Sequence, residues 1–336
     1  MTVSEPRAQE HVAPSRPTPA RRVIDTVGAT NLGLLIALLV LGTFLTWRTP
    51  NFLTAANLLN IALAVSLLGI VAISQTVVIV SGGLDISAGS IAGLASVSTA
   101  IIVGAAGTAI AGVAGGIIVV ALAGLGNGLI ITVGRVNPVI ATLATLSAYR
   151  GLAFIVTDGK AVGVTDQAFN SLGSGRLAFI PYPVIVLILV AVGFGVLMRF
   201  TDIGRNIYAM GSNPAAARLA GIGLDRYKLG IYALSGAAAG LAGVLLTART
   251  TSGQPASGSQ GLELEAITAA VLGGAALSGG RGTVVGALLG VFVIGTLNNG
   301  LILLNVPTFY QLVAKGLLLV FAVVLSERRF RFRRAG

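Results

Sequence analysis

The sequence predicts an all-α membrane protein with about ten transmembrane helices, and two observations support this. The 336 residues are 55% hydrophobic and only 10% charged, whereas soluble domains carry about 25% charged residues. The charges are also clustered: none lies between Arg48 and Asp85, between Asp85 and Arg135, or between Arg281 and Lys315. Each of these gaps is longer than the ~20 apolar residues that one helix needs to cross a bilayer.

The expected helices are apolar runs that end at polar residues, glycines or prolines. The third run begins inside "SGGLDISAGS", and the eighth is short and ends in "GGAALSGGRG", so these two have the least regular pattern. The ten expected spans are, in chain order, 31–47, 58–80, 84–103, 108–133, 139–156, 183–199, 229–248, 266–277, 284–304 and 310–325.

Two polar tails flank the apolar part of the chain. Residues 1–28 are rich in Pro and Arg and are expected to form a disordered, basic cytoplasmic tail. No apolar signal-peptide core precedes about Gly33, so the first run is interpreted as a retained span. Residues 29–326 then form the transmembrane domain, and residues 327–336 form a polybasic tail.

The basic residues predict the orientation, because cytoplasmic loops of membrane proteins are enriched in Lys and Arg. With the N-terminus in the cytoplasm, 16 of the 22 basic residues lie inside, and ten spans also return the C-terminus to the cytoplasm. The basic C-terminus is expected to lie at the anionic leaflet, with nucleic-acid binding as the alternative. The largest cytoplasmic loop is 200–228, and the external segments are 158–182 and 251–265. The residues counted as inside are Arg7, Arg16, Arg21, Arg22, Arg135, Arg199, Arg205, Arg218, Arg226, Lys228, Arg281, Arg328, Arg329, Arg331, Arg333 and Arg334.

Glycines and a faint internal similarity say more about architecture than about function. Gly-x-x-x-Gly pairs let helices approach closely in lipid, and they occur at 89/93, 124/128, 236/240 and 286/290. "GNGLI" at 126–130 precedes Asn137-Pro138 and "YRGLAF", much as "NNGLI" at 298–302 precedes Val306-Pro307 and "AKGLLL". Either this similarity is chance, or it relates spans four and five to spans nine and ten as an inverted repeat.

The residues that enzymes and ion-coupled carriers need are scarce. Metalloprotease, dinucleotide-binding and P-loop motifs are absent, the only histidine is His11 in the tail, and the chain has no cysteine. A proton-coupled carrier normally needs a carboxylate deep in a span, and the one candidate is Asp85 in the motif of Gly82, Gly83, Asp85 and Ser87. The favoured interpretation is that Asp85 caps the third span.

Two cations fall inside expected spans. Arg150 lies 12 residues after Pro138, and Lys315 lies 8 residues after Pro307, which places them roughly 18 Å and 12 Å along their helices. Either they line a polar pathway and hydrogen-bond a hydroxylated solute, or they snorkel to the external headgroups.

The segment "GRNIYAMGSNPAAARLAGI" at 204–222 interrupts the apolar pattern. Ser212 and Asn213 are suited to cap a helix, Pro214 to the first helical position, and Gly221 to the end. An isolated helix of this length is unstable in water. We therefore expect it to dock on a cytosolic partner that drives transport, with an ordinary solvated loop helix as the alternative.

Long motifs in the right order make the chain similar to the permease subunits of ribose/xylose-type ATP-binding-cassette (ABC) sugar importers. The resemblance covers about 43–325. Its five motifs are, in chain order, "VSGGLDISAGSIAGL", "RVNPVIATLATLSAYRGLAF", "GRNIYAMGSNPAAARLAGI", "LELEAITAAVLGGAALSGGRGTVVGALLG" and the looser "LNNGLILLNVPTFYQLVAKGLLL". Lys315 departs from the family, whose members often have an uncharged residue there.

The resemblance implies a vitamin-importer-like permease fold in the bacterial inner membrane, and no cofactor or metal. It implies a second permease copy, two cytosolic ATPases, an external solute-binding protein and no nucleic acid. A permease for a nucleoside or an amino acid is the alternative, and a proton-coupled carrier or an inert scaffold fits less well. The positions that the resemblance assigns to ATPase coupling are Gly204, Arg205, Asn206, Gly211, Asn213, Ala216, Arg218 and Gly221.

Overall fold

The computed structural model describes residues 29–334, and this part of the chain is helical, as predicted. Four strands of two residues each join as two short antiparallel pairs, β1 with β4 and β2 with β3. The elements are α2 (Ala29–Arg48), α3 (Ala55–Val80), α4 (Ala88–Ala106), α5 (Ala109–Thr132), α6 (Pro138–Ile155), β1 (Val162–Gly163), α7 (Gln167–Ser174), β2 (Arg176–Leu177), β3 (Ile180–Pro181), α8 (Tyr182–Phe200), α9 (Asp202–Ser212), α10 (Pro214–Leu219), α11 (Leu224–Thr250), β4 (Ser252–Gly253), α12 (Leu262–Leu272), α13 (Val284–Leu303) and α14 (Thr308–Arg334).

Local sequence signals set many of the helix boundaries. The Thr54, Thr108 and Thr283 side chains accept backbone N–H groups in the first turns of α3, α5 and α13. Asn137 does the same for α6, where Pro138 occupies the first position. These side chains satisfy amide groups that a helix leaves without an internal partner.

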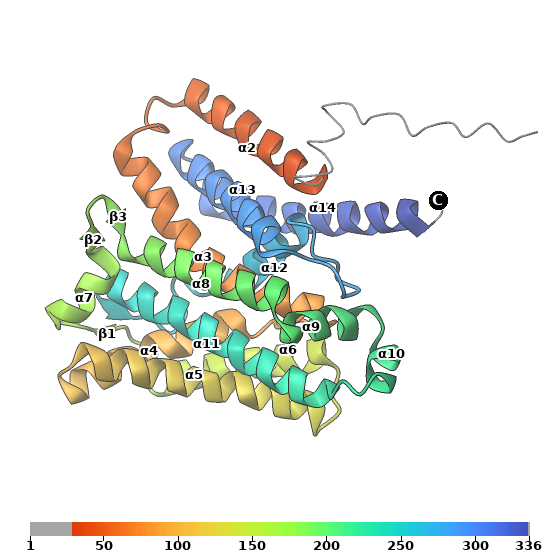
Figure 1. The fold of residues 1–336 in the computed structure, drawn as a ribbon. Coiled ribbons are helices and arrows are strands. Elements are labelled where there is room, and N and C mark those ends of the chain that lie inside the picture. Colours follow the sequence, from red (N-terminus) through yellow and green to blue (C-terminus); the bar gives the residue numbers. More distant parts are fainter. Residues whose placement is uncertain (1–28, 335–336) are drawn as a thin grey trace, which may run out of the picture.

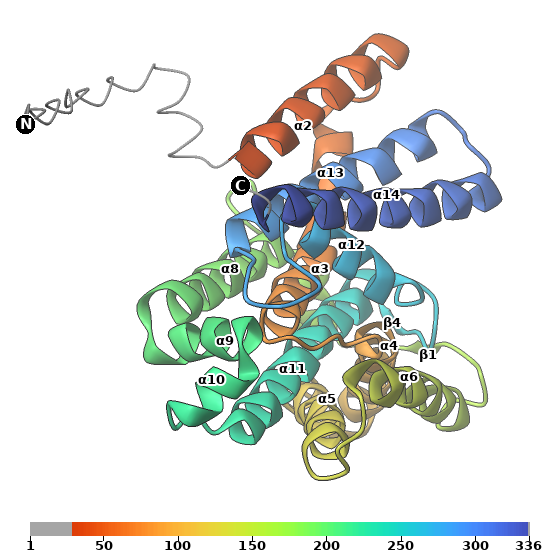
Figure 2. The same ribbon diagram turned by 90° about the vertical axis from the view of Figure 1, so that its right-hand side faces the viewer.

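Helix α3 forms the centre of the bundle (Figure 1). It packs against α8, α11, α12 and α13, and the side chains of Ile70, Val71 and Ile73 have no exposed surface. On one side of it, α11 lies against α4 and α5, while α2, α12, α13 and α14 form the other side (Figure 2). A helix that is hydrophobic on every face is suited to such a central position.

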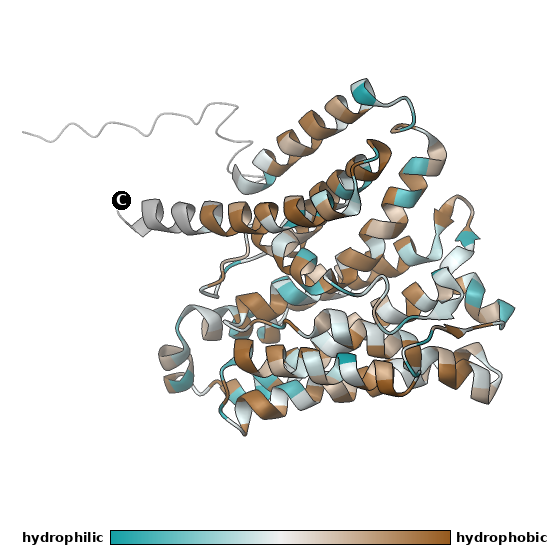
Figure 3. Cartoon of the chain, turned by 180° about the vertical axis from the view of Figure 1, so that it is seen from behind, coloured by the Kyte–Doolittle hydropathy of each residue, from teal (hydrophilic) through white to brown (hydrophobic). Residues whose placement is uncertain are grey.

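The peripheral helices have apolar side chains on their outer surfaces. Leu39 of α2, Leu189 of α8 and Leu317 of α14 are each at least 65% exposed. Apolar residues extend along most helices, and hydrophilic ones gather mainly near loops and helix ends (Figure 3). Exposed apolar surface of this extent is expected where lipid or another membrane subunit covers the protein.

The predicted number of ten spans is only partly reproduced, because eight of the described helices are long and apolar enough to cross a membrane. The eighth predicted span corresponds to α12, whose 11 residues reach roughly 16 Å, about half of the ~30 Å hydrocarbon core. The tenth corresponds to the apolar part of α14, Thr308–Val324. The weak third prediction was right, since it corresponds to α4.

The sequence predicts two tail boundaries, one after residue 28 and one after residue 326. The predicted tail 1–28 lies outside the described residues. The other predicted boundary, at residue 326, does not coincide with a helix end, because α14 continues to Arg334.

Glycines bring α5 and α11 into backbone contact. A Cβ atom at Gly124 would lie 2.9 Å from the Cα of Gly236 and would overlap the carbonyl oxygen of Tyr232. In α13, a Cβ at Gly290 would overlap the carbonyl oxygen of Ala269 in α12. The predicted role of the Gly-x-x-x-Gly pairs in close packing is therefore confirmed at these crossings.

We predict that Gly124→Val separates α5 from α11 and lowers the free energy of unfolding by about 1–3 kcal/mol. The measurement is the midpoint of thermal unfolding in detergent. Gly193→Val in α8 is the matched control, because no atom lies within 4 Å of its Cβ position. Equal midpoints for the two variants would contradict a close α5–α11 crossing.

Candidate functional site

The polar segment predicted to form a short helix does so. The Asn213 side chain accepts the N–H of Ala216 at 3.0 Å, Pro214 occupies the first position of α10, and Gly221 has a φ of +82° just beyond its end. Helix α9 precedes it, and the side chain of Thr201, the N-cap residue just before α9, accepts the N–H of Gly204 at 3.2 Å. The segment is thus a pair of capped helices, of which the sequence predicted only the second.

Helix α10 presents a mixed apolar and basic surface to solvent. Ala216 and Arg218 are exposed, and the neighbouring Leu219 is 90% exposed, whereas Ala217 is buried against the protein. An exposed leucine beside an arginine is a surface that a protein partner could cover. Leu219 was not among the predicted coupling residues, although it lies between Arg218 and Gly221, which were.

The eight predicted coupling positions fall into two groups. Exposed positions, which a partner could contact, are Arg205, Asn213, Ala216, Arg218 and Gly221. Gly204 and Gly211 are buried, and Asn206 is half-buried with its side chain donating to the Tyr227 hydroxyl at 2.6 Å. Arg205 forms an ion pair with Asp202 on the surface of α9. Part of the motif therefore serves internal packing.

Asp85 lies in the break between α3 and α4 and has no exposed surface. Its carboxylate accepts the backbone N–H of Ser87 at 3.0 Å, the Ser87 hydroxyl at 2.6 Å and the Ser235 hydroxyl at 2.9 Å. Ser87, rather than Asp85, occupies the position that precedes α4. The capping interpretation therefore needs correction: Asp85 binds Ser87, the residue just before α4, and ties it to α11.

Further polar groups satisfy the backbone at this break. Gln75 donates to the Asp85 carbonyl at 2.7 Å, and Tyr232 donates to the Leu84 carbonyl at 3.1 Å. Asn127 of α5 donates to the Ser87 hydroxyl at 2.7 Å. A buried polar group without partners is costly, so this network allows an irregular backbone inside the bundle. Gln75 and Ser235 were not predicted to bind at this break, because nothing in a single sequence shows which helices meet.

Lys315 has a partner that was not predicted. Its Nζ lies 2.7 Å from Glu265 Oε1 across α14 and α12, and Asn298 of α13 donates to Glu265 Oε2 at 3.0 Å. The two charged side chains are only 32% and 21% exposed. Three helices thus meet at one carboxylate, which the sequence had placed at the edge of an external segment.

Arg150 is not brought into the same ion pair. It is half-buried, its Nε has no hydrogen-bond partner among the described residues, and its charge acts favourably on Glu263 in the first turn of α12. Glu263 is buried, and its Oε2 also lacks a partner in this part of the chain. The start of α12 therefore gathers two carboxylates and two cations.

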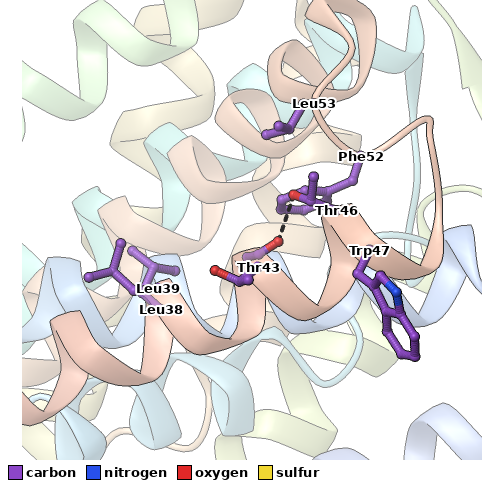
Figure 4. A pocket seen from close by; sticks show the side chains of 8 residues that line it. Leu38, Leu39, Thr43, Thr46, Trp47, Phe52 and Leu53 are labelled. Carbon is purple, nitrogen blue, oxygen red and sulfur yellow. Dashed lines mark hydrogen bonds between the residues drawn. The ribbon is translucent and has the colours of Figure 1, made fainter.

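A separate hollow of about 500 Å³ lies beside α2 (Figure 4). Mainly apolar side chains surround it, with few groups to hydrogen-bond a polar solute, so it is not a candidate solute site. Its lining residues are Leu38, Leu39, Gly42, Thr43, Thr46, Trp47, Phe52 and Leu53.

Comparison with known proteins identifies the family. Residues 57–323 match the family described as branched-chain amino acid transport system / permease component. The chain is 43% identical to the ribose import permease protein RbsC of Bacillus subtilis, over 89% of this chain and 93% of that one. It is 40% identical to the L-arabinose ABC transporter permease protein AraH of Azospirillum brasilense, over 90% and 89% of the two chains. The ribose import permease protein RbsC of Escherichia coli K12 is also 40% identical, over 88% and 93%.

No solved structure matches the chain. The family match nevertheless covers most of the helical domain, from residue 57, just inside α3, to residue 323 in α14. The chain therefore belongs to the branched-chain amino acid transport system / permease component family and is a multi-pass membrane permease.

Proposed function

We propose that this chain is the permease subunit of a bacterial ABC importer that carries a monosaccharide or related polyol across the inner membrane. The observation that carries the proposal is the similarity, over about nine-tenths of both chains, to permeases named for ribose and for L-arabinose. Both are pentoses with several hydroxyl groups. ATP is hydrolysed on a separate cytosolic ATPase, since the chain carries no P-loop.

Helix α10 is the proposed contact through which movement of the ATPase is passed to the permease. Its exposed Ala216, Arg218 and Leu219 offer an apolar and basic surface, and the caps at Asn213 and Gly221 give the helix defined ends. When nucleotide binding moves the ATPase, a docked α10 moves with it. This places the loop 200–228, and both chain termini, in the cytoplasm.

On this orientation, α12 and α14 complete the ten crossings, with α12 as a half-crossing. The segment before α12 folds back into the protein, where Ser259 has no exposed surface and a Cβ at Gly93 of α4 would lie 2.6 Å from the Pro255 carbonyl oxygen. Irregular backbone is tolerated at membrane depth only where protein or water surrounds it.

An inverted repeat also gains support from polar contacts. "GLDISA" from Gly83 and "GLELEA" from Gly261 precede α5 and α13 at similar distances. Asn127 on α5 donates to Ser87, and Asn298 on α13 donates to Glu265, which holds the same place in the second motif. We propose that α4–α6 and α12–α14 are the two related units.

Two further partners follow from the proposed function. The exposed apolar faces of α6 and α14, which include Leu143 and Leu317, would be covered by a second permease copy or by lipid. An external solute-binding protein would dock on the segments around β1 and β4, which pair with Val162 opposite Gly253. Solute selection would rest mainly with that protein.

The alternative functions require different features of the chain. The family description names branched-chain amino acids, so an amino acid or nucleoside permease is the second candidate. A proton-coupled carrier needs a carboxylate free to exchange protons, and the oxygens of Asp85 are already occupied by Ser87 and Ser235. The structure thus offers no support for that mechanism at Asp85.

The test of function is reconstitution of the permease with its ATPase and binding protein in vesicles. We expect ATP-dependent uptake of labelled ribose or arabinose that survives a proton ionophore at constant ATP. Labelled leucine and adenosine are the matched alternatives. Uptake that needs no ATPase, or that the ionophore abolishes, would overturn the proposal.

Leu219→Asp should weaken the association of the permease with the ATPase by tenfold or more. Burying a leucine contributes about 1.5–3 kcal/mol, and 1.4 kcal/mol corresponds to a factor of ten. The measurement is binding of the purified ATPase to the permease in detergent. Arg48→Glu, at an exposed end of α2, is the control, and equal affinities for the two variants would exclude docking through α10.

The pair of Lys315 and Glu265 distinguishes a pathway from snorkelling. If the pair is structural and also lines the pathway, Lys315→Met should lower both thermal stability and uptake, because it leaves a half-buried carboxylate without its cation. Glu265→Gln in the same chain should then restore stability, while uptake stays about tenfold low.

The remaining outcomes separate the other roles of Lys315. Full uptake in the double variant would make the pair purely structural. If Lys315→Met alone changes neither stability nor uptake, snorkelling is favoured. A double-mutant cycle is suited to this question because the two side chains are in direct contact.

A further inference from the structure

Three segments that are far apart in the sequence come into contact at one point in the structure. They are the end of α3, the end of α9 and the loop between α12 and α13. We call Gly82, Gly211, Gly279 and Gly280 the glycine junction. The N–H of Gly280 donates to the Val80 carbonyl at 2.8 Å, and this single backbone hydrogen bond joins the loop to the end of α3.

No side chain separates the three backbones. A Cβ atom at Gly211 would overlap the Val80 carbonyl oxygen and lie 2.7 Å from the Gly280 amide nitrogen. A Cβ at Gly279 would lie 2.6 Å from the Gly211 carbonyl oxygen and 3.1 Å from the Cα of Gly82. Contacts of this kind cannot yield by a change of side-chain rotamer, so displacement of one segment displaces the others.

Backbone conformation fixes the residue type at this point. Gly82, Gly279 and Gly280 have φ values of +82°, +85° and +74°. These lie in the left-handed region, which side chains disfavour. The junction therefore depends on glycine both for close approach and for its turns.

Tyr208 adds a side-chain hydrogen bond to this contact. From α9 its hydroxyl donates to the Gly282 carbonyl at 2.7 Å, immediately beyond the junction. Burial raises the pKa of the Tyr208 hydroxyl, so it keeps the proton that it donates. The side chain of the next residue, Thr283, accepts the N–H of Gly286 and caps the N-terminus of α13, so Tyr208 joins α9 to the start of that helix.

The junction is continuous with the network of Asp85. Val80 ends α3, and the five residues after Gly82 lead to Ser87 and α4. Asp85 and Ser87 in turn bind Ser235 of α11 and Asn127 of α5. A movement of α9 and α10 therefore reaches α3, α4 and α13 through main-chain contacts and a few hydrogen bonds.

We propose that Tyr208 and the glycine junction are the transmission point of this permease, through which movement of α10 is passed to the α3–α4 break and to the start of α13. They are positioning residues, since none of them is proposed to contact solute or nucleotide. The inference rests on the proposed function, because it needs α10 to be moved by an ATPase.

The experiment measures ATP hydrolysis and solute uptake in the same proteoliposomes of the full complex, with ATPase and binding protein present. In Tyr208→Phe we expect unchanged binding of the ATPase and unchanged hydrolysis. We expect the solute carried per ATP to fall about three- to tenfold, the scale of one hydrogen bond. The hydroxyl is the only group removed, so the fold should be retained, and thermal unfolding in detergent checks this.

Tyr182→Phe is the matched control, because Tyr182 is also half-buried and its hydroxyl makes no hydrogen bond to the described part of the chain. Gly211→Ala is the stronger variant, since its methyl group would push α9 away from Val80 and Gly280. It should uncouple uptake from hydrolysis more completely. If it fails to assemble, Tyr208→Phe still decides the question.

Two results would overturn the inference. One is that Tyr208→Phe leaves uptake and hydrolysis both unchanged, and therefore also their ratio. The other is a fall of both in proportion, together with lost ATPase binding, which would make Tyr208 part of the docking surface alone. Failure of the proposed function is distinguishable, because the unaltered permease would then show no ATP-dependent uptake before any variant is compared.

Discussion

The structure depends on how the protein keeps a broken backbone satisfied inside a bundle of apolar helices. Between α3 and α4 the chain leaves helical geometry, and Ser81, Asp85 and Ser87 of this break are buried in the protein. Asp85 makes this possible, because its carboxylate and carbonyl bind groups from α3, α11 and the start of α4. In an apolar medium each unpaired polar group is costly, so the positions of the surrounding helices follow from this one residue.

Glycine is the second requirement, and it acts on two scales. Along α5 and α11 it brings long helices into contact over their length, which gives a rigid body in the absence of a hydrophobic drive between helices in lipid. At the glycine junction it brings three non-helical segments into backbone contact. The same residue type therefore supports both the close packing of the long helices and the link between them and the segment of α9 and α10.

The second polar centre, at the start of α12, differs from the first in that charged side chains have polar atoms without hydrogen-bond partners among residues 29–334. Both oxygens of the Asp85 carboxylate accept hydrogen bonds, although the neighbouring Gln75 Oε1 has no partner in the described part of the chain. At the start of α12, by contrast, the charged groups Glu263 Oε2 and Arg150 Nε lack hydrogen-bond partners among residues 29–334. Glu265 there binds Lys315 and Asn298. Unpaired buried polar atoms of charged side chains are suited to hydrogen-bond a hydroxylated solute, so we propose that the pathway lies beside α12.

The sequence by itself determined the all-helical membrane class, most helix positions, the capped helix at 214–219 and the family motifs, because apolar periodicity, caps and glycine spacing are local signals. It overestimated the number of full spans, since an apolar run does not reveal that α12 stops after 11 residues. Only the tertiary structure decided that Lys315 binds Glu265, that Asp85 is held by Ser235, and that Gly211 contacts Val80 and Gly280. These pairs are distant in the chain, and which helices meet is set by packing in three dimensions.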